Sequence, residues 1–310
     1  MKWFASTIAV FAAFGTGAIS KRACSNAELK VEVYHEKETS VQYQGKDDLL
    51  YSPTAYTLIH SDKQAVLVDT PTLAKDGAVL AKWIANTAPG VSLKYIYITH
   101  AHADHFNSFP AILERFPEAK VVTTDGVIEH MPAQYEGPLW DYFWKGLFPS
   151  IEKTDLSLVQ VLPADGKFTI DDGKHELHAI VVGEGDTVDS TVLHVPSLDL
   201  VVGGDVVYGH CYQYLAENPT SEMRARWLQS LDKIAQLKPK IVIPSHMQAF
   251  EDFGTQHLAE TKQYIHTWNL FLHKAKSWEE LEGMAKKRFP ERIGTFILRY
   301  TAQSFFNATF

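Results

Sequence analysis

One short segment, residues 99–105, constrains the fold and the chemistry of this chain more than any other. It follows an apolar run at 93–98 that predicts a strand, and it precedes a pattern typical of a helix. Four strong ligand side chains for metal ions stand in six of its residues: His100, His102, Asp104 and His105. Alternate side chains of an extended backbone share one face, so the first two imidazoles can bind one ion. The last two side chains, where the chain turns into the helix, can face a second ion. Such a cluster leaves charge uncompensated unless a cation binds, so the sequence predicts a metal centre.

The segment resembles the HxHxDH signature of the metallo-β-lactamase superfamily, and later segments extend the resemblance. Asp205 ends an apolar run after two glycines and is similar to the family's aspartate that bridges two metal ions. His246 follows a second apolar run and resembles the family's last histidine, although Ser245 replaces the commoner glycine. Asp69 stands where the family has an aspartate that supports the metal loops through hydrogen bonds. The resemblance covers most of residues 50–250.

The resemblance implies an α+β fold, a four-layer αββα sandwich with the metals at one edge, and the pattern along the chain agrees with it. Strand patterns occur at 29–34, 55–60, 64–69, 93–98, 120–123, 160–162, 167–170, 176–182, 190–194, 198–202 and 240–244. Helical spacing occurs at 74–86, 108–115, 126–135 and 221–237, the last with Ser221 as the expected cap. Two β-rich stretches, each followed by helices, favour two sheets packed face to face with helices outside. Residues from about 254 onward lie outside the resemblance and predict extra C-terminal helices.

The chain departs from the family pattern at one ligand. The family has a further histidine in a Gly-His-Thr-x-Gly-Ser context, and here an alignment on Gly185, Thr187 and Ser190 puts Asp186 in its place. Three interpretations stay open: Asp186 ligates the first ion, that ion is weakly held, or Glu184 swings in. We favour Asp186, because carboxylate is an accepted zinc ligand. An anion there lowers the Lewis acidity of the ion and makes manganese or iron more acceptable, with two zinc ions as the first expectation.

Two ions that share a bridging hydroxide predict hydrolysis. Metal binding lowers the pKa of water toward neutrality, and one ion would polarise the carbonyl of the substrate. Asp104 could ligate, orient the hydroxide and pass a proton to the leaving group. Tyr208 or His210, which follow the bridging aspartate, could donate to the carbonyl oxygen, although a histidine in such a place often only supports other residues.

The expected substrate is a small molecule with a lactone, a lactam or another carboxylic ester or amide bond. The formal net charge of -8 and the absence of a basic patch argue against a nucleic-acid partner. One alternative is a mono-iron oxidoreductase on the same scaffold, which the aspartate at position 186 keeps open. Another is a non-catalytic homologue that binds metal without turning over a substrate.

The aromatic segment 139–144 also carries two interpretations. It holds a leucine followed by Trp140, a tyrosine, Phe143 and Trp144, with one aspartate among them. These side chains could form a lid over an apolar or ring-bearing substrate, or they could pack in the core of a helix.

The N-terminus predicts a secreted protein. Lys2 precedes an apolar run at 3–14 and small residues at 15–18, which is the layout of a signal peptide. We therefore assign residues 1–22 to a signal and processing segment and residues 24–310 to one hydrolase domain. No membrane association is expected after the signal is removed, and the oligomeric state is left open. Cys24 and Cys211 could pair in an oxidising compartment or stay as thiols.

Overall fold

The computed structural model describes residues 21–24 and 29–308, so most of the predicted signal segment 1–22 lies outside the described residues. The first sheet has the strand order β1-β2-β5-β6-β7-β8-β9. Its strands are β1 (Lys21–Cys24), β2 (Lys30–His35), β5 (Ala55–His60), β6 (Gln64–Val68), β7 (Ser92–Tyr97), β8 (Lys120–Thr123) and β9 (Val159–Val161). Neighbouring strands are antiparallel from β1 to β6 and parallel from β6 to β9.

The second sheet has the strand order β10-β11-β12-β13-β14. Its strands are β10 (Lys167–Ile170), β11 (His175–Gly183), β12 (Ser190–Val195), β13 (Leu200–Val202) and β14 (Ile241–Ile243). Neighbouring strands are antiparallel from β10 to β13, whereas β13 and β14 run parallel. Since the carboxyl ends of parallel strands meet at one edge of a sheet, the turns after β13 and β14 lie together.

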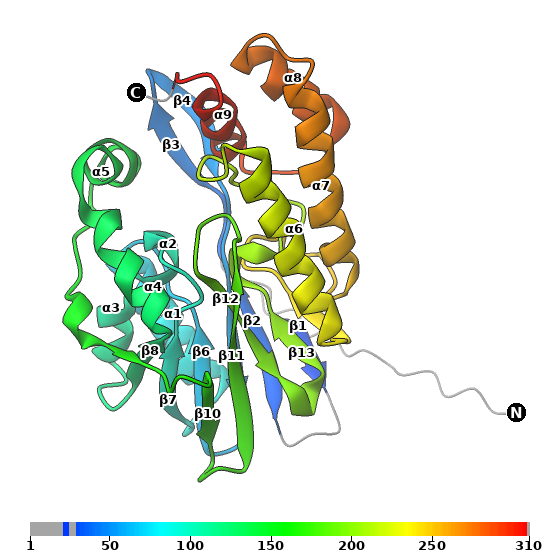
Figure 1. The fold of residues 1–310 in the computed structure, drawn as a ribbon. Helices are drawn as coiled ribbons and strands as arrows, with labels where there is room; N and C mark the ends of the chain where they lie inside the picture. Colours follow the sequence, from blue (N-terminus) through cyan, green and yellow to red (C-terminus); the bar gives the residue numbers. More distant parts are fainter. Residues whose placement is uncertain (1–20, 25–28, 309–310) are drawn as a thin grey trace, which may run out of the picture.

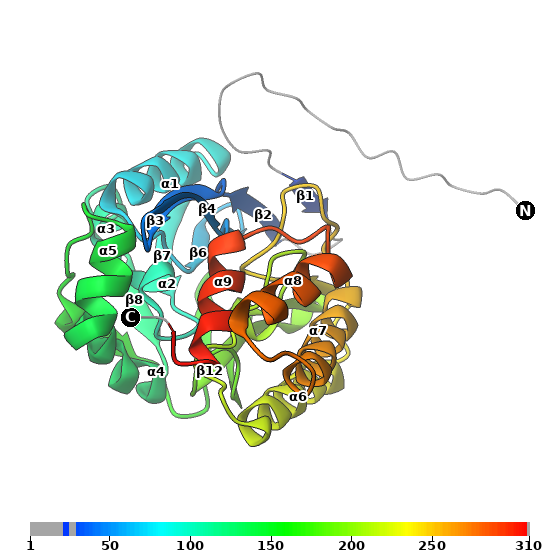
Figure 2. The same ribbon diagram turned by 90° about the horizontal axis from the view of Figure 1, so that it is seen from above.

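Helices cover the outer faces of both sheets. The α-helices are α1 (Ala74–Thr87), α2 (Ala103–Phe106), α3 (Phe109–Leu113), α4 (Asp125–His130), α5 (Lys145–Leu147), α6 (Ser221–Gln236), α7 (Gln256–Leu272), α8 (Trp278–Arg288) and α9 (Thr295–Ser304). Figure 1 shows α1, α3 and α4 on one side of the strands and α6 and α7 on the other. Seen from above in Figure 2, α9 lies between these two groups of helices. The predicted αββα sandwich with extra C-terminal helices is confirmed.

The alternation of side chains along the strands builds three apolar layers. Leu58 of β5 packs in the cluster beneath α1, whereas its neighbour Ile59 packs between the two sheets. In β13, Val201 packs in the cluster beneath α6, whereas Val202 packs between the sheets. Both sheets are therefore buried on two faces, as helices on either side of a sheet pair require.

Three local predictions differ from the structure. The chain forms a hairpin that we did not predict, β3 (Thr39–Tyr43) and β4 (Lys46–Tyr51), which packs beside α9 and α5. The helix predicted at 126–135 ends at His130 and continues as the 3-10 segment η1 (Met131–Tyr135). The cap of α6 is Thr220 rather than Ser221, since the Thr220 hydroxyl accepts from the Met223 amide at 3.1 Å.

Two further expectations concern the cysteines and the membrane. Cys211 is a buried free cysteine, and the side chain of Cys24 lies outside what the structure describes. Within the described ranges, every helix is too short or too polar to cross a membrane.

Candidate metal centre

Seven buried side chains that the sequence predicts as ligands meet at one edge of the two sheets. They are His100, His102, Asp104, His105, Asp186, Asp205 and His246. They come from the turn after β7 (His100 and His102), from α2 itself (Asp104 and His105), from the loop between β11 and β12, and from the turns after β13 and β14. The described residues place their ligand atoms in two groups, each within 4.8 Å.

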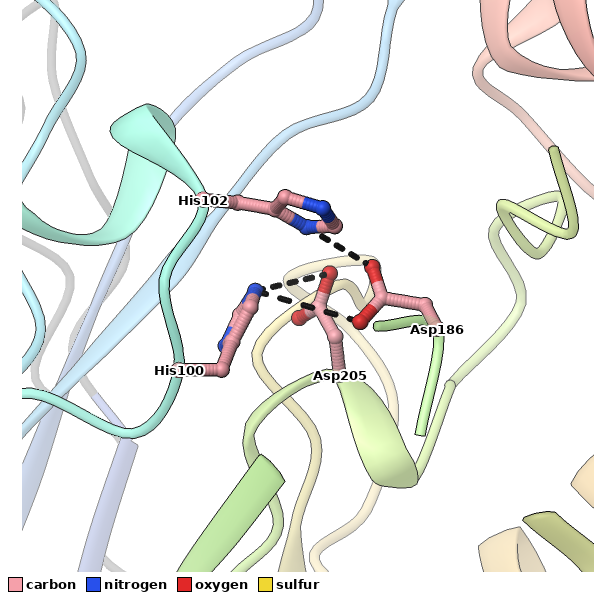
Figure 3. Close-up of side chains that lie close together, drawn as sticks. All are labelled: His100, His102, Asp186 and Asp205. Atoms are coloured by element: carbon pink, nitrogen blue, oxygen red, sulfur yellow. Dashed lines mark ion pairs between the residues drawn. The ribbon is translucent and has the colours of Figure 1, made fainter. Parts of the chain in front are cut away.

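The first group consists of His100, His102, Asp186 and Asp205, which point toward one another in Figure 3. Nδ1 of His102 lies 3.1 Å from Oδ2 of Asp186. Nε2 of His100 lies 4.0 Å from an oxygen of each aspartate. Ligands of one ion are expected at such separations, because each donor atom sits about 2.0–2.2 Å from a bound zinc.

The second group consists of Asp104, His105 and His246, and Asp205 touches it as well. The two oxygens of Asp205 lie 3.4 Å from Nε2 of His105 and 3.0 Å from Nε2 of His246. Oδ2 of Asp104 lies 3.7 and 3.6 Å from the same two nitrogens. Asp205 therefore stands between the two groups, where a bridging carboxylate would be needed.

Hydrogen bonds hold His100 in the tautomer that a metal requires. Its Nδ1 lies 2.9 Å from the Thr99 hydroxyl, and that hydroxyl donates its one hydrogen to Asp69 at 2.8 Å. The hydroxyl must therefore accept from Nδ1 of His100, so Nε2 faces the aspartates with a lone pair. This assignment follows from the hydrogen-bond network around the ring.

The other three histidines are held in the same way. Nδ1 of His105 lies 3.0 Å from Asp69, and Nδ1 of His246 lies 2.9 Å from the Pro53 carbonyl oxygen. Nε2 of His102 lies 3.1 Å from Glu217. Each outer nitrogen donates to an oxygen that only accepts, so in the neutral ring each inner nitrogen carries the lone pair, directed at the cluster. This arrangement prepares four imidazoles as ligands.

Several inner atoms have no hydrogen-bond partner among the described residues. They are Nε2 of His100, Nε2 of His105, Oδ1 of Asp186 and Oδ1 of Asp205. Buried polar atoms without partners are rare in folded proteins and are costly. A cation would satisfy all of them at once, so the residues present fit a pair of divalent metal ions.

Electrostatics leads to the same conclusion. Burial raises the pKa of Asp186 to about 7, with His102 opposing the shift and Asp205 adding to it. Burial lowers the pKa of His102, but Asp186 and Glu217 outweigh it and hold that pKa well above its ordinary value. Without a cation, buried carboxylates must share protons with imidazoles, and a metal ion would replace those protons.

The backbone around the ligands is tightly constrained. Gly204, immediately before Asp205, has a φ of 51°, and a Cβ there would lie 2.9 Å from Oγ1 of Thr99. Only glycine adopts this conformation at no steric cost, and only glycine leaves room for the close approach of the two loops. The Gly-Asp pair thus positions Asp205 against the turn that carries His100.

The two groups open into one cavity. Its polar side holds His102, Asp104, Asp186, Asp205, Glu217 and His246. Its remaining wall is largely aromatic and aliphatic, with Tyr51, Leu139, Phe143, Trp144, Tyr208, Tyr212, Tyr214 and Ile297. A mostly apolar cavity with a few polar groups at one end is the usual form of a small-molecule site.

The segment η2 (Leu139–Trp144) is a π-helix whose aromatic side chains pack in the core, as one of the two interpretations predicts, and also line the cavity. Phe143 and Trp144 line the cavity and also belong to the core cluster beneath the first sheet. The segment is therefore a packed wall of the cavity. Single-turn π-helices occur often at functional sites.

The structure places the two predicted donors to a substrate carbonyl, Tyr208 and His210, in different surroundings. Tyr208 lines the cavity, and its hydroxyl donates to Asp205 at 3.0 Å. Among the described residues, His210 is not part of the cavity wall, and its ring faces Glu251 and Glu260 instead. The expectation that His210 donates to a substrate carbonyl is corrected by this placement, because the turn after Asp205 directs its side chain toward α7.

Two glutamates also have clear placements. Glu184, the alternative ligand, pairs with Arg226 at 3.0 Å and accepts from Asn218. Glu217, which the sequence analysis missed, accepts from His102 and, at 2.7 Å, from the Thr187 hydroxyl. A lone glutamate in a polar connection gives no local signal, so only the fold could reveal this contact.

Comparisons with known proteins agree with this geometry. A family model described as the metallo-beta-lactamase superfamily matches residues 51–246. A metallo-beta-lactamase from Pontibacter korlensis has a similar structure, with a TM-score of 0.56 and 19% identity, covering 80% of this chain and 99% of that chain. The metallo-beta-lactamase FIM-1 from Pseudomonas aeruginosa, solved in a mono-zinc form, has a TM-score of 0.53 and 16% identity, covering 82% and 98%.

One curated relative has a different activity. A nitric oxide reductase of Moorella thermoacetica is 25% identical over 199 residues, which make up 62% of this chain and 48% of that protein. The match thus spans about half the length of that relative. The family model covers more than half of the chain and spans all seven clustered ligands, so this chain belongs to the metallo-beta-lactamase superfamily.

Proposed function

We propose that this protein is a metal-dependent hydrolase that cleaves a lactone, a lactam or another carboxylic ester or amide bond in a small substrate. The superfamily and the ligand cluster support a metal-dependent hydrolase fold. The observation that carries the finer proposal is that Asp205 joins two ligand groups at the polar end of one cavity with an apolar wall.

Bound divalent ions would supply an acidified water and an electrophile for the carbonyl oxygen. Asp104, whose Oδ2 accepts from the Tyr51 hydroxyl at 2.9 Å, lies at the edge of the cavity where it can accept a proton and return it to the leaving group. Burial raises the pKa of Tyr208 well above 10, and Asp205 and Asp186 add to the shift. Tyr208 therefore stays protonated, and it would donate to a developing oxyanion when its one hydrogen turns away from Asp205.

The wall of the cavity supports the choice of substrate. Phe143 and Trp144 come from η2, and Ile297 comes from α9, so the C-terminal helices contribute to the cavity. Aromatic and aliphatic walls favour a substrate with a ring or a short apolar chain next to the scissile bond. The carboxylates at the polar end disfavour a substrate with several negative charges.

Iron-dependent oxidoreduction is the second candidate. Two observations favour it: the nitric oxide reductase among the relatives, and the oxygen ligand of Asp186 in place of a nitrogen. Oxygen ligands increase the tolerance of a site for iron and manganese. We keep two zinc ions as the first assignment, because four prepared imidazoles suit zinc.

A screen with quantified metal separates these proposals. Zinc-loaded and iron-loaded protein would be tested against lactones, lactams, esters and thioesters, and for consumption of oxygen and nitric oxide. We expect hydrolysis of at least one carboxylic substrate, with its loss in His102→Ala and Asp186→Ala and retention in the control His178→Ala. Full metal content and rate in Asp186→Ala would contradict its role as a ligand. Gas consumption by the iron form without hydrolysis would favour the oxidoreductase.

We also propose that the protein is secreted, on the basis of the N-terminal pattern at residues 1–22. Expression of the full chain in a eukaryotic host tests this. N-terminal sequencing of the secreted product should find that it begins after residue 22. Protein that stays inside the cell with an intact Met1 would contradict the proposal.

A further inference from the structure

The cavity at the metal centre has no positively charged side chain in its wall. Among the described residues that line it, there is no lysine and no arginine. The carboxylates of Asp104, Asp186, Asp205 and Glu217 face it, and their four negative charges offset those of a pair of divalent ions. The filled centre therefore offers no excess positive charge, and a carboxylate on a substrate would find no partner in the wall. The cavity suits a substrate that is uncharged away from its scissile bond.

One buried amide in this wall is separate from the metal centre. Gln134, near the end of η1, lines the cavity together with Phe143 and Trp144, and it belongs to neither group of clustered ligands. Its side chain is only 5% exposed. A buried amide needs hydrogen-bond partners, so the partners of Gln134 decide what this part of the cavity can bind.

The indole of Trp144 fixes the orientation of this amide. Nε1 of Trp144 donates to Oε1 of Gln134 at 3.0 Å, and an indole nitrogen can only donate, so the amide oxygen must face it. The amide nitrogen, Nε2, carries the hydrogens that are left to donate. Among the described residues, Trp144 is the only hydrogen-bond partner of this side chain, so Nε2 has none. The wall of the cavity therefore holds a buried donor without an acceptor.

The neighbouring residue holds Gln134 in place. The backbone carbonyl oxygen of Tyr135 accepts from Nζ of Lys153 at 2.7 Å. The ring of Tyr135 meets the ring of Trp140 edge to face, with 5.1 Å between the centroids. These contacts tie η1 to η2 and to the segment after it. A donor held in this way loses little freedom when a ligand binds, so it can contribute to selectivity.

We propose that Gln134 selects the substrate by donating from Nε2 to an uncharged oxygen, such as a ketone, amide or ether oxygen, on the part that is not cleaved. This inference rests on the proposed function, because it names the substrate class of the same cavity. The substrate is then a lactone, lactam or ester whose apolar part packs against Phe143 and Trp144 and carries one neutral acceptor. A substrate without that acceptor leaves the buried amide unpaired and is bound less tightly.

Matched lactones test the proposal on the zinc-loaded protein. One γ-lactone carries a para-acetylphenyl group and the other a para-ethylphenyl group, so the two differ in a single ketone oxygen. We expect kcat/KM of the wild type to be about 5- to 100-fold higher for the acetyl lactone, the range for a buried donor that gains an acceptor. A lactone with a para-carboxyphenyl group should react more slowly than the acetyl lactone, because the wall has no cation to pair with its charge. A preference for the carboxylate would overturn the proposal.

Two variants separate a contact with the substrate from support of the fold. Gln134→Met removes the amide, whereas Gln134→Glu, as a carboxylate, removes the donor but keeps an acceptor for the Trp144 indole. Both should abolish the preference for the acetyl lactone and leave the rate on the ethyl lactone nearly unchanged. The control Gln160→Met, at an exposed glutamine of β9, should keep the preference. An equal loss of rate on both lactones would mean that Gln134 only supports the wall, which would overturn the proposal.

Binding of unreactive analogues gives a second measurement that needs no hydrolysis. Tetrahydrofurans with the same acetylphenyl and ethylphenyl groups have no scissile bond, and calorimetry measures their Kd. The wild type should bind the acetyl compound about 5- to 100-fold more tightly, and Gln134→Met should not distinguish the two. If this preference holds while no lactone is cleaved, the hydrolysis is contradicted and the role of Gln134 stands. Equal affinities of the wild type for both compounds would overturn the proposal and would mean that water satisfies Nε2.

Discussion

Oε1 of Glu217 lies 3.1 Å from Nε2 of His102, on the opposite side of the ring from Asp186. The other oxygen of Glu217 accepts from Thr187, the residue after Asp186. One carboxylate therefore fixes the tautomer of a histidine ligand and also holds the loop of the neighbouring aspartate. Partners of this kind orient ligands and increase their basicity.

Glu217→Gln should weaken metal binding without removing it. The amide keeps the shape of the side chain, but it removes the charge and cannot accept from both Thr187 and His102. We expect a loss of about 10- to 100-fold in zinc affinity, as for other partners of ligating histidines. Competition with a chromophoric chelator measures it. The exposed Glu136→Gln serves as control, and an unchanged affinity in Glu217→Gln would show that the contact does not tune the site.

Asp69→Asn should disturb the centre although Asp69 is not itself one of the clustered ligands. Asp69 accepts from the Thr99 amide and hydroxyl and from His105. Asparagine tolerates the φ of 61° found there, but its one oxygen cannot serve all three donors.

We expect Asp69→Asn to cost about 1–3 kcal/mol in stability and to lower metal content, because a buried donor loses its partner. Chemical denaturation and metal analysis check this. Asp172→Asn, at an exposed residue with a φ of 56°, controls for the backbone. Normal metal content in Asp69→Asn would mean that His105 keeps its tautomer unaided.

The sequence predicted which side chains cluster, because most of them stand in local patterns. His100, His102, Asp104 and His105 share one motif, and Asp205 and His246 each end an apolar strand. The place where these residues meet follows from the order of the strands in the sheets, and the resemblance to the family supplies that order.

Local sequence patterns could not predict the contacts that depend on tertiary packing. Glu217 is 115 positions from His102, and no spacing rule links the two. The direction of His210 depends on how α7 packs against the loop after Asp205. The hairpin β3–β4 did carry a local signal, which is the glycine of its two-residue turn Gln44-Gly45; both residues adopt positive φ in the structure.

Glu36 should make stability depend on pH. Burial raises its pKa to about 8, with a hydrogen bond from Tyr56 opposing the shift and the charges of Asp76 and Asp104 adding to it. A carboxyl with a raised pKa in the folded state prefers to fold protonated. Its contribution to stability is therefore complete below about pH 4.5, its ordinary pKa, and is lost as the pH rises through about 8.

Glu36→Gln should then stabilise the protein more as the pH rises. The amide stays neutral and can still accept from the Tyr56 hydroxyl, which lies 2.9 Å from Glu36. Melting temperatures of the two proteins should nearly coincide at pH 5 and separate by several degrees at pH 9. A difference that stays constant across this range would contradict the assignment of a raised pKa to Glu36.

Ile297→Ala should change substrate preference more than the chemistry. Ile297 lies on α9, is 5% exposed, and lines the cavity beside the aromatic wall. Its loss should cost about 2–5 kcal/mol in stability and enlarge the apolar end of the cavity.

For a hydrolysed substrate with a ring, kcat/KM of Ile297→Ala should fall about 10- to 200-fold, the range for a changed apolar contact. A small ester without a ring should lose far less, since its contacts end near Asp104 and Tyr208. Paired kinetics on the two substrates measure the ratio, with the conservative Ile297→Val as control. An equal loss for both substrates would mean that α9 supports the fold of the centre and does not select the substrate.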